Sequence, residues 1–213
     1  MSILNVTDES TQVVLQLFPE IIGGTPAFDP MTTDAISLPP NGQLTLTNVV
    51  QSQFQLTNVK GALWVVSLDG TPVVLSSRTF TADTSGGSFG QDVTSVLVAD
   101  RAWAGGLSHD SFYRTNLGIF WPWDLPAGQT ARFDVTVHDQ AGTEVGAGVI
   151  SFAEAGLQQL SFGSFGVQTL IDGYAVITCS DPSAVWYAYA SRVDQITGDA
   201  VYRPARGFQS ALP

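Results

Sequence analysis

A Gly-x-Ser-x-Gly pattern at residues 86–90 is the part of the sequence closest to a catalytic motif. In hydrolases this pattern places a nucleophilic serine on a sharp turn between a strand and a helix, above a parallel sheet. Here the flanking residues predict no helix, and the chain lacks alternating strand and helix patterns. A glycine-rich turn therefore explains Ser88 better, and a hydrolase is the third of three functional hypotheses.

The two histidines, His109 and His138, are the candidates for a general base. Ser108, His109 and Asp110 include the three residue types of a catalytic triad, but neighbours on an extended chain point to opposite sides and cannot bond in series. His138 falls on the polar face of a predicted strand, so we expect it in solvent. Cys179 is the only cysteine, and we expect a buried, inert thiol.

Aspartates near predicted turns suggest calcium as an alternative, either at Asp194, Thr197 and Asp199 or at Asp83, Gly86 and Asp92. The chain contains no Asp-x-Asp-x-Asp loop, and aspartates in turns commonly accept bonds from their own backbone. Two separated histidines and one cysteine also argue against a catalytic zinc or iron site. We therefore predict no metal and no cofactor. No pair among the nineteen acidic residues stands out for glycoside hydrolysis.

Phe120, Trp121 and Trp123 form the group that most strongly indicates binding. Two tryptophans around a proline at the end of a predicted strand are expected to be at least partly exposed. Flat aromatic faces stack on sugar rings or anchor protein interfaces, so exposed and coplanar rings would favour a carbohydrate-binding module. The alternative is that one tryptophan closes the end of a β-sandwich. Trp64 and Trp186 are expected in or near the core.

Short alternating runs bounded by Gly, Pro, Asn and Asp predict the strands that position these residues. The predicted strands are residues 11–18, 34–38, 43–48, 61–68, 72–80, 113–120, 130–139, 144–152, 173–179 and 185–193. In the strand over 130–139, Phe133, Val135 and Val137 alternate with polar residues, so one face covers a core. Short strands without a convincing helix are typical of a sandwich or barrel.

An internal comparison predicts a tandem duplication. Residues 61–69 align with 173–181, and each segment is followed by a turn and a similar second segment, 75–79 or 189–193, that contains an arginine. Residues 36–44 align with 150–158 in the same way. We therefore expect an all-β protein of two immunoglobulin-like β-sandwich units, residues 1–100 and 101–213, joined near residues 100–106. We expect the first unit to lack a counterpart of the strand containing Arg114, so that a neighbouring chain could complete it.

A family resemblance rests on residues 112–120 and 188–205, with a similar pattern at residues 77–80 and 87–91. These segments resemble a poorly characterised β-sandwich repeat, immunoglobulin-like in architecture, that is common in bacterial secreted and cell-surface proteins. The resemblance implies an extracellular or cell-surface location and supplies no catalytic residues. Trp121 and Trp123 depart from the family pattern, in which small polar residues follow the strand.

Composition limits the classes of partner. The formal net charge is −11 and the basic residues are scattered, which disfavours nucleic acid and anionic membrane surfaces. The longest apolar runs are about ten residues, short of the roughly 20 that a membrane-spanning helix needs. With 13% charged residues and a mean hydropathy of +0.17, we expect apolar surface to be covered by a partner. The first hypothesis is thus a non-catalytic structural or adhesive protein that binds another protein, itself included, or a polysaccharide.

Overall fold

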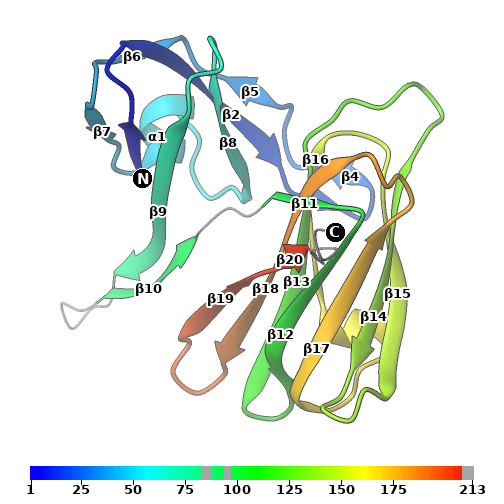
Figure 1. Cartoon of the computed structure of the whole chain (residues 1–213). Helices are drawn as coiled ribbons and strands as arrows, with labels where there is room; N and C mark the ends of the chain where they lie inside the picture. The colour runs from blue at the N-terminus through cyan, green and yellow to red at the C-terminus, as the bar shows by residue number, and fades with distance from the viewer. Residues whose placement is uncertain (83–87, 94–96, 208–213) are drawn as a thin grey trace, which may run out of the picture. The chain divides into compact units, whose positions relative to one another are not determined.

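The computed structural model is predominantly β, which confirms the all-β prediction (Figure 1). It describes residues 1–82, 88–93 and 97–207, and the side chains of residues 80–82, 88–91 and 97–99 lie outside that description. Contacts divide the chain into two compact units, Met1–Thr79 with Asp92–Thr94 and Phe80–Gln91 with Ser95–Pro213. Each unit contains two main sheets.

The first unit is built on two antiparallel sheets. One has the strand order β10-β9-β1-β7, and in the other β2 lies between β8 on one side and β5 and β6 on the other. A two-stranded hairpin joins β3 and β4. The elements are β1 (Ser2–Asn5), β2 (Thr11–Pro19), β3 (Ile21–Ile22), β4 (Thr25–Pro26), β5 (Met31–Thr32), β6 (Ile36–Leu38), β7 (Gln43–Thr45), α1 (Val49–Phe54), β8 (Gly61–Ser67), β9 (Val73–Ala82) and β10 (Ser88–Val93). Of the last two strands, residues 80–82 and 88–91 are assigned to the second unit by their contacts.

The core of the first unit lies between these sheets. Ile3 of β1 comes from one sheet, and alternate residues of β2, together with Val65 of β8, come from the other. Phe54 of α1 is buried in the same cluster. A further set of apolar residues around this cluster is only partly buried: Met1, Phe28, Ile36, Leu44, Leu46, Val49, Val50, Leu56, Leu63, Val73 and Leu75.

The second unit also has two antiparallel sheets, called here the C sheet and the F sheet. The C sheet has the order β11-β18-β13-β16, with β19 also paired to β18, and the F sheet has the order β15-β14-β17-β12-β20. The elements are β11 (Leu97–Ala99), β12 (Arg101–His109), β13 (Tyr113–Trp121), β14 (Ala131–His138), β15 (Glu144–Phe152), β16 (Gly156–Ser161), the 3-10 helix η1 (Phe162–Phe165), β17 (Leu170–Cys179), β18 (Val185–Asp194), β19 (Ala200–Pro204) and β20 (Arg206–Gly207).

Phe133 of β14 lies at the centre of an aromatic core in the second unit. Its ring centroid is 5.0 Å from that of Trp186, 5.7 Å from Phe152 and 6.0 Å from Trp121, and all three pairs are edge-on. The predicted alternation of β14 is confirmed, since Phe133, Val135 and Val137 are buried. Trp186 is fully buried, as expected.

The two units share a pattern of strand pairing. In the first unit β1 pairs with β7 and β9, and in the second β13 pairs with β16 and β18. Likewise β2 pairs with β6 and β8, while β14 pairs with β15 and β17. By pairing, β1 in the first unit lies between two strands, as β13, the strand containing Arg114, does in the second unit.

The units differ at one sheet edge. In the second unit β12 pairs with β17 on the side away from β14. Among the described residues of the first unit, β8 pairs with β2 alone. Among the described residues, no strand therefore lies beside β8 in the place that β12 takes beside β17.

Candidate functional site

The predicted aromatic group does not form a shared exposed platform. Trp121 is the last residue of β13, and the alternation of that strand turns its ring into the core, where it is 4% exposed. Phe120 is 6% exposed and lies beside Tyr187, with ring centroids 5.8 Å apart. Trp123 is 43% exposed, and its indole N–H donates to the carbonyl of Val185 at 2.6 Å. The expectation that both tryptophans are exposed is therefore wrong for Trp121.

Ser108, His109 and Asp110 do not bond to one another. The Oγ of Ser108 accepts from the N–H of Asp172 at 3.3 Å, and Nδ1 of His109 accepts from the N–H of Thr115 at 3.3 Å. Asp110 accepts from the N–H groups of Phe112, in the loop between β12 and β13, and of Tyr113, the first residue of β13. Burial lowers the pKa of His109 below its ordinary value, which favours the neutral ring that accepts this bond. These side chains secure the loop instead of forming a triad.

The carboxylate of Asp194 forms hydrogen bonds within its own turn. Its carboxylate accepts from the N–H groups of Ile196 and Thr197 at 2.8 and 3.0 Å, and these bonds hold its pKa below the ordinary value. No group of three or more His, Cys, Asp or Glu side chains in the described part of the chain is placed to hold a metal ion. Asp83 and the Gly-x-Ser-x-Gly side chains lie outside the described residues, so the structure gives no account of those two alternatives.

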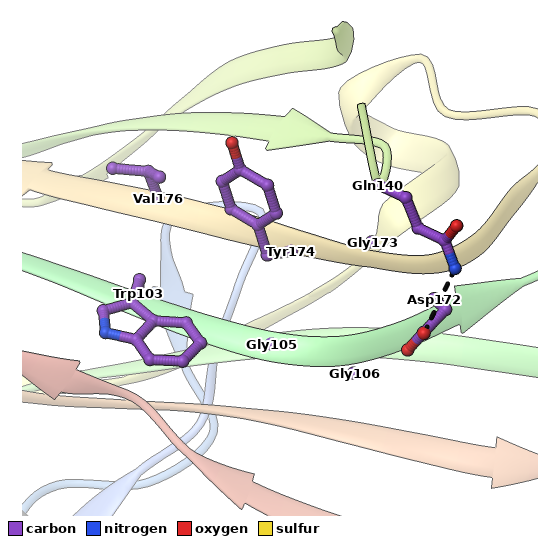
Figure 2. Close-up of a pocket in the computed structure, with 8 residues that line it drawn as sticks. All are labelled: Trp103, Gly105, Gly106, Gln140, Asp172, Gly173, Tyr174 and Val176. Carbon is purple, nitrogen blue, oxygen red and sulfur yellow. Dashed lines mark hydrogen bonds between the residues drawn. The ribbon is translucent and has the colours of Figure 1, made fainter. Parts of the chain in front are cut away.

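A shallow groove of about 470 Å³ lies on the outer face of the F sheet (Figure 2). Trp103 of β12 and Tyr174 of β17 line it from neighbouring strands, and Gly105 of β12 is the register partner of Tyr174. A Cβ atom at Gly105 would lie 2.5 Å from Cζ3 of Trp103, so the indole ring occupies the space that a side chain there would fill. Trp103 is 41% exposed. The groove thus presents a large aromatic side chain to solvent over glycine backbone.

One end of the groove is polar. Gln140 donates from Nε2 to Oδ2 of Asp172 at 3.2 Å, and both residues are exposed (Figure 2). Asp172 has a φ of +53° and Gly106 a φ of +68°, on paired strands whose register shifts here. Such an irregularity turns side chains away from the regular pleat, and here it accompanies a carboxylate at the groove.

His138 supports this surface from the next strand. It lies on the polar face of β14 as predicted, but it is half-buried and its ring stacks on Tyr174 with centroids 5.0 Å apart and planes at 14°. Its Nε2 lies 2.9 Å from the hydroxyl of Thr136 and its Nδ1 lies 3.2 Å from the carbonyl oxygen of Gly142. One face of Tyr174 is thus covered by His138. Its other side lies toward β12, where Gly105 has no side chain.

Two sheet edges differ in how they are protected. On β15, the partner of β14, a register irregularity lies at Val145, and the Nε2 of Gln158 donates to the carbonyl of Ser151 at 2.6 Å. Both features hinder addition of another strand. On β8, the N–H of the next residue, Leu68, donates to Gln12 of β2 at 2.9 Å. Because amide direction alternates along a strand, the amides of Leu63, Val65 and Ser67 point away from β2.

No helix among the described residues has the length and apolar character needed to cross a membrane. No protein-family model and no curated protein matches the chain. A solved structure titled "Crystal Structure of Thermotoga maritima 1070" is similar to it, with 13% sequence identity and a TM-score of 0.43 over 52% of this chain and 95% of that chain. A similarity of that size supports no argument about fold or function.

Proposed function

We propose that this protein is a non-catalytic structural or adhesive β-sandwich protein that acts outside the cell and associates with further copies of itself. The observation that carries the proposal is the edge of β8. In the second unit the equivalent edge, that of β17, is covered by β12, whereas β2 is the only described strand that pairs with β8. A strand from a second copy would take the position that β12 takes.

The composition of β8 suits this role. Its seven residues, Gly-Ala-Leu-Trp-Val-Val-Ser, contain no charge and no proline, which are the usual obstacles to strand addition. Leu63 is only partly buried against the core of the first unit, and Val66 is half-buried on the opposite face. An added strand would cover both faces and would also occupy the outward amides of Leu63, Val65 and Ser67.

An antiparallel pair of β8 strands centred on Val65 is self-complementary. It places Leu63 opposite Ser67 of the second copy and Trp64 opposite Val66 of the second copy, with about six new backbone hydrogen bonds. Each such bond contributes about 1 kcal/mol net, and each aromatic and β-branched pair adds up to about 1 kcal/mol. Association itself costs at least about 4 kcal/mol. We therefore expect a weak, concentration-dependent dimer with two-fold symmetry.

Sedimentation equilibrium of the full chain between about 5 and 500 μM tests the proposal across the range where a weak dimer forms. Val66→Glu places a carboxylate at the seam between the two strands and should leave a monomer. Val14→Glu is the matched control, because Val14 is the direct register partner of Val66 on β2, has similar exposure and lies one strand from the seam. A monomeric wild type, or dimers unaffected by Val66→Glu, would overturn the proposal.

Other features support the wider proposal. The resemblance of residues 112–120 and 188–205 to repeats of bacterial secreted and surface proteins supports a location outside the cell. The shared order of pairing in the two units, together with their sequence similarity, supports our inference that they are immunoglobulin-like units related by duplication. The bonding of Ser108, His109 and Asp110 to separate partners supports a non-catalytic role.

A further inference from the structure

We infer that the groove on the outer face of the F sheet binds a neutral saccharide. This site belongs to the second unit and is independent of the proposed pairing through β8. It also differs from the aromatic group at Phe120, Trp121 and Trp123 that the sequence suggested.

The aromatic side chains supply the first part of the recognition. A pyranose ring has a face of C–H groups that packs against an aromatic ring, while its hydroxyl groups point outward around the edge. Trp103, at 41% exposure, offers such a surface, and Tyr174 stands on the neighbouring strand as the register partner of Gly105. His138 stacks on Tyr174, and the indole of Trp103 lies over the backbone of Gly105, so each ring already packs against the protein before a ligand arrives.

Asp172 and Gln140 supply the second part. The carboxylate can accept hydrogen bonds from two sugar hydroxyls, and the amide can both donate and accept. Their mutual bond at 3.2 Å sets the two groups side by side at one end of the groove. A small number of convergent polar groups beside an apolar surface is typical of small-molecule sites, and about 470 Å³ falls within their usual range of about 300–1,000 Å³.

Charge selects the class of saccharide. The carboxylate of Asp172 lies in the groove, and the chain as a whole carries a formal net charge of −11. Both features repel sulfated, phosphorylated or uronic acid ligands. The groove is also open and shallow, which suits a segment of a neutral chain lying across the sheet better than an enclosed monosaccharide.

The test is a titration of the full chain with neutral oligosaccharides. Cello-, xylo-, malto- and chito-oligosaccharides are screened by chemical shift changes, and the best of them is measured by calorimetry. Trp103→Ala should weaken binding at least tenfold, and Asp172→Ala should weaken it by a similar factor. Gly105→Ala keeps the indole but displaces it, because the new Cβ would lie 2.5 Å from the ring, and it should also weaken binding.

Trp123→Ala is the matched control, since Trp123 is exposed to a similar extent (43%) and lies outside the groove. It should bind as wild type does. Loss of binding in Trp123→Ala with retention in Trp103→Ala would overturn the inference in favour of the surface around Trp123. Absence of binding by wild type up to about 5 mM ligand, a concentration that reveals even millimolar affinities, would also overturn it. Preferential binding of an acidic saccharide such as a uronic acid oligomer would do the same.

Discussion

Replacement of Trp121 separates a structural role from a binding role for this residue. The ring is 4% exposed and meets the edge of Phe133, which in turn contacts Trp186 and Phe152. Trp121→Ala removes one of the three rings that contact Phe133, and such truncations cost about 3–5 kcal/mol. We expect a loss of unfolding free energy in that range for the second unit.

The indole nitrogen of Trp121 makes a second variant informative. In the described part of the chain this N–H finds no acceptor, and burying an unpaired donor costs about 1–3 kcal/mol. Trp121→Phe removes that unpaired group while keeping an aromatic ring. The smaller ring leaves a cavity that lowers stability, whereas removal of the unpaired donor raises it. The two effects offset one another in part, so we expect the unfolding free energy of the phenylalanine variant to lie within about 1.5 kcal/mol of the wild-type value.

Urea unfolding provides the assay, with amide NMR signals of β14 as the probe because they report on the second unit alone. Trp123→Ala is again the control variant. We expect it to lose clearly less unfolding free energy than Trp121→Ala, because the ring of Trp123 is largely outside the core. A loss below about 1 kcal/mol for Trp121→Ala, or equal losses for the two alanine variants, would refute the placement of Trp121 in the core.

Three further outcomes are expected. Cys179 is buried and burial raises its pKa, so the native protein should resist a thiol reagent at pH 8 and react once it is unfolded in urea; rapid native reaction would contradict this. Asp69 accepts hydrogen bonds from the N–H of Thr71 and the hydroxyls of Thr11 and Ser67, and these bonds lower its pKa. The stability that the ionised carboxylate adds is therefore present above the unfolded pKa of about 3.9 and is lost as pH falls through the lower folded pKa. The Tm difference between wild type and Asp69→Asn should be larger at pH 6 than near pH 2, and an equal difference at both would contradict this. Gly118→Ala places a Cβ 2.3 Å from the ring of Tyr189 and should lower stability by about 1–3 kcal/mol in thermal unfolding, whereas an unchanged Tm would show that the ring moves away freely.

The all-β class could be predicted because apolar and polar residues alternate strictly in strands such as β14. Every second residue there faces the core, so periodicity alone identifies both the strand and its buried face. The similarity between residues 61–69 and 173–181 also corresponds to β8 and β17, which hold equivalent places in the pairing of the two units. Local patterns of this kind can be recognised in a single sequence.

Strand β12 and the groove were missed for a physical reason. Over β12 the apolar and small residues Ala102, Trp103, Ala104, Gly105 and Gly106 follow one another, so the contrast between the two faces is weak. Trp103 and Tyr174 are 71 positions apart in the sequence, and only the pairing of β12 with β17 places them on neighbouring strands. The local pattern that indicates the groove is Trp103 among small residues, because a large ring can lie over the backbone of a neighbouring glycine such as Gly105.

The burial of Trp121 does not follow from the sequence, because a proline between two tryptophans is typical of a loop. The strand instead continues through Trp121, and only the residues after it leave the sheet. The direction of a ring at a strand end depends on the last paired residue, and sequence patterns locate that residue only to within a few positions.

Hydrogen exchange along β8 tests the proposed association most directly. The amides of Leu63, Val65 and Ser67 point away from β2, whereas those of Trp64 and Val66 point toward it. Exchange is measured at about 5 μM and about 500 μM, on either side of a weak dimer's midpoint. The account predicts that Leu63, Val65 and Ser67 become protected only at the higher concentration, while Trp64 and Val66 are protected at both. Equal, fast exchange of the three outward amides at both concentrations would contradict it.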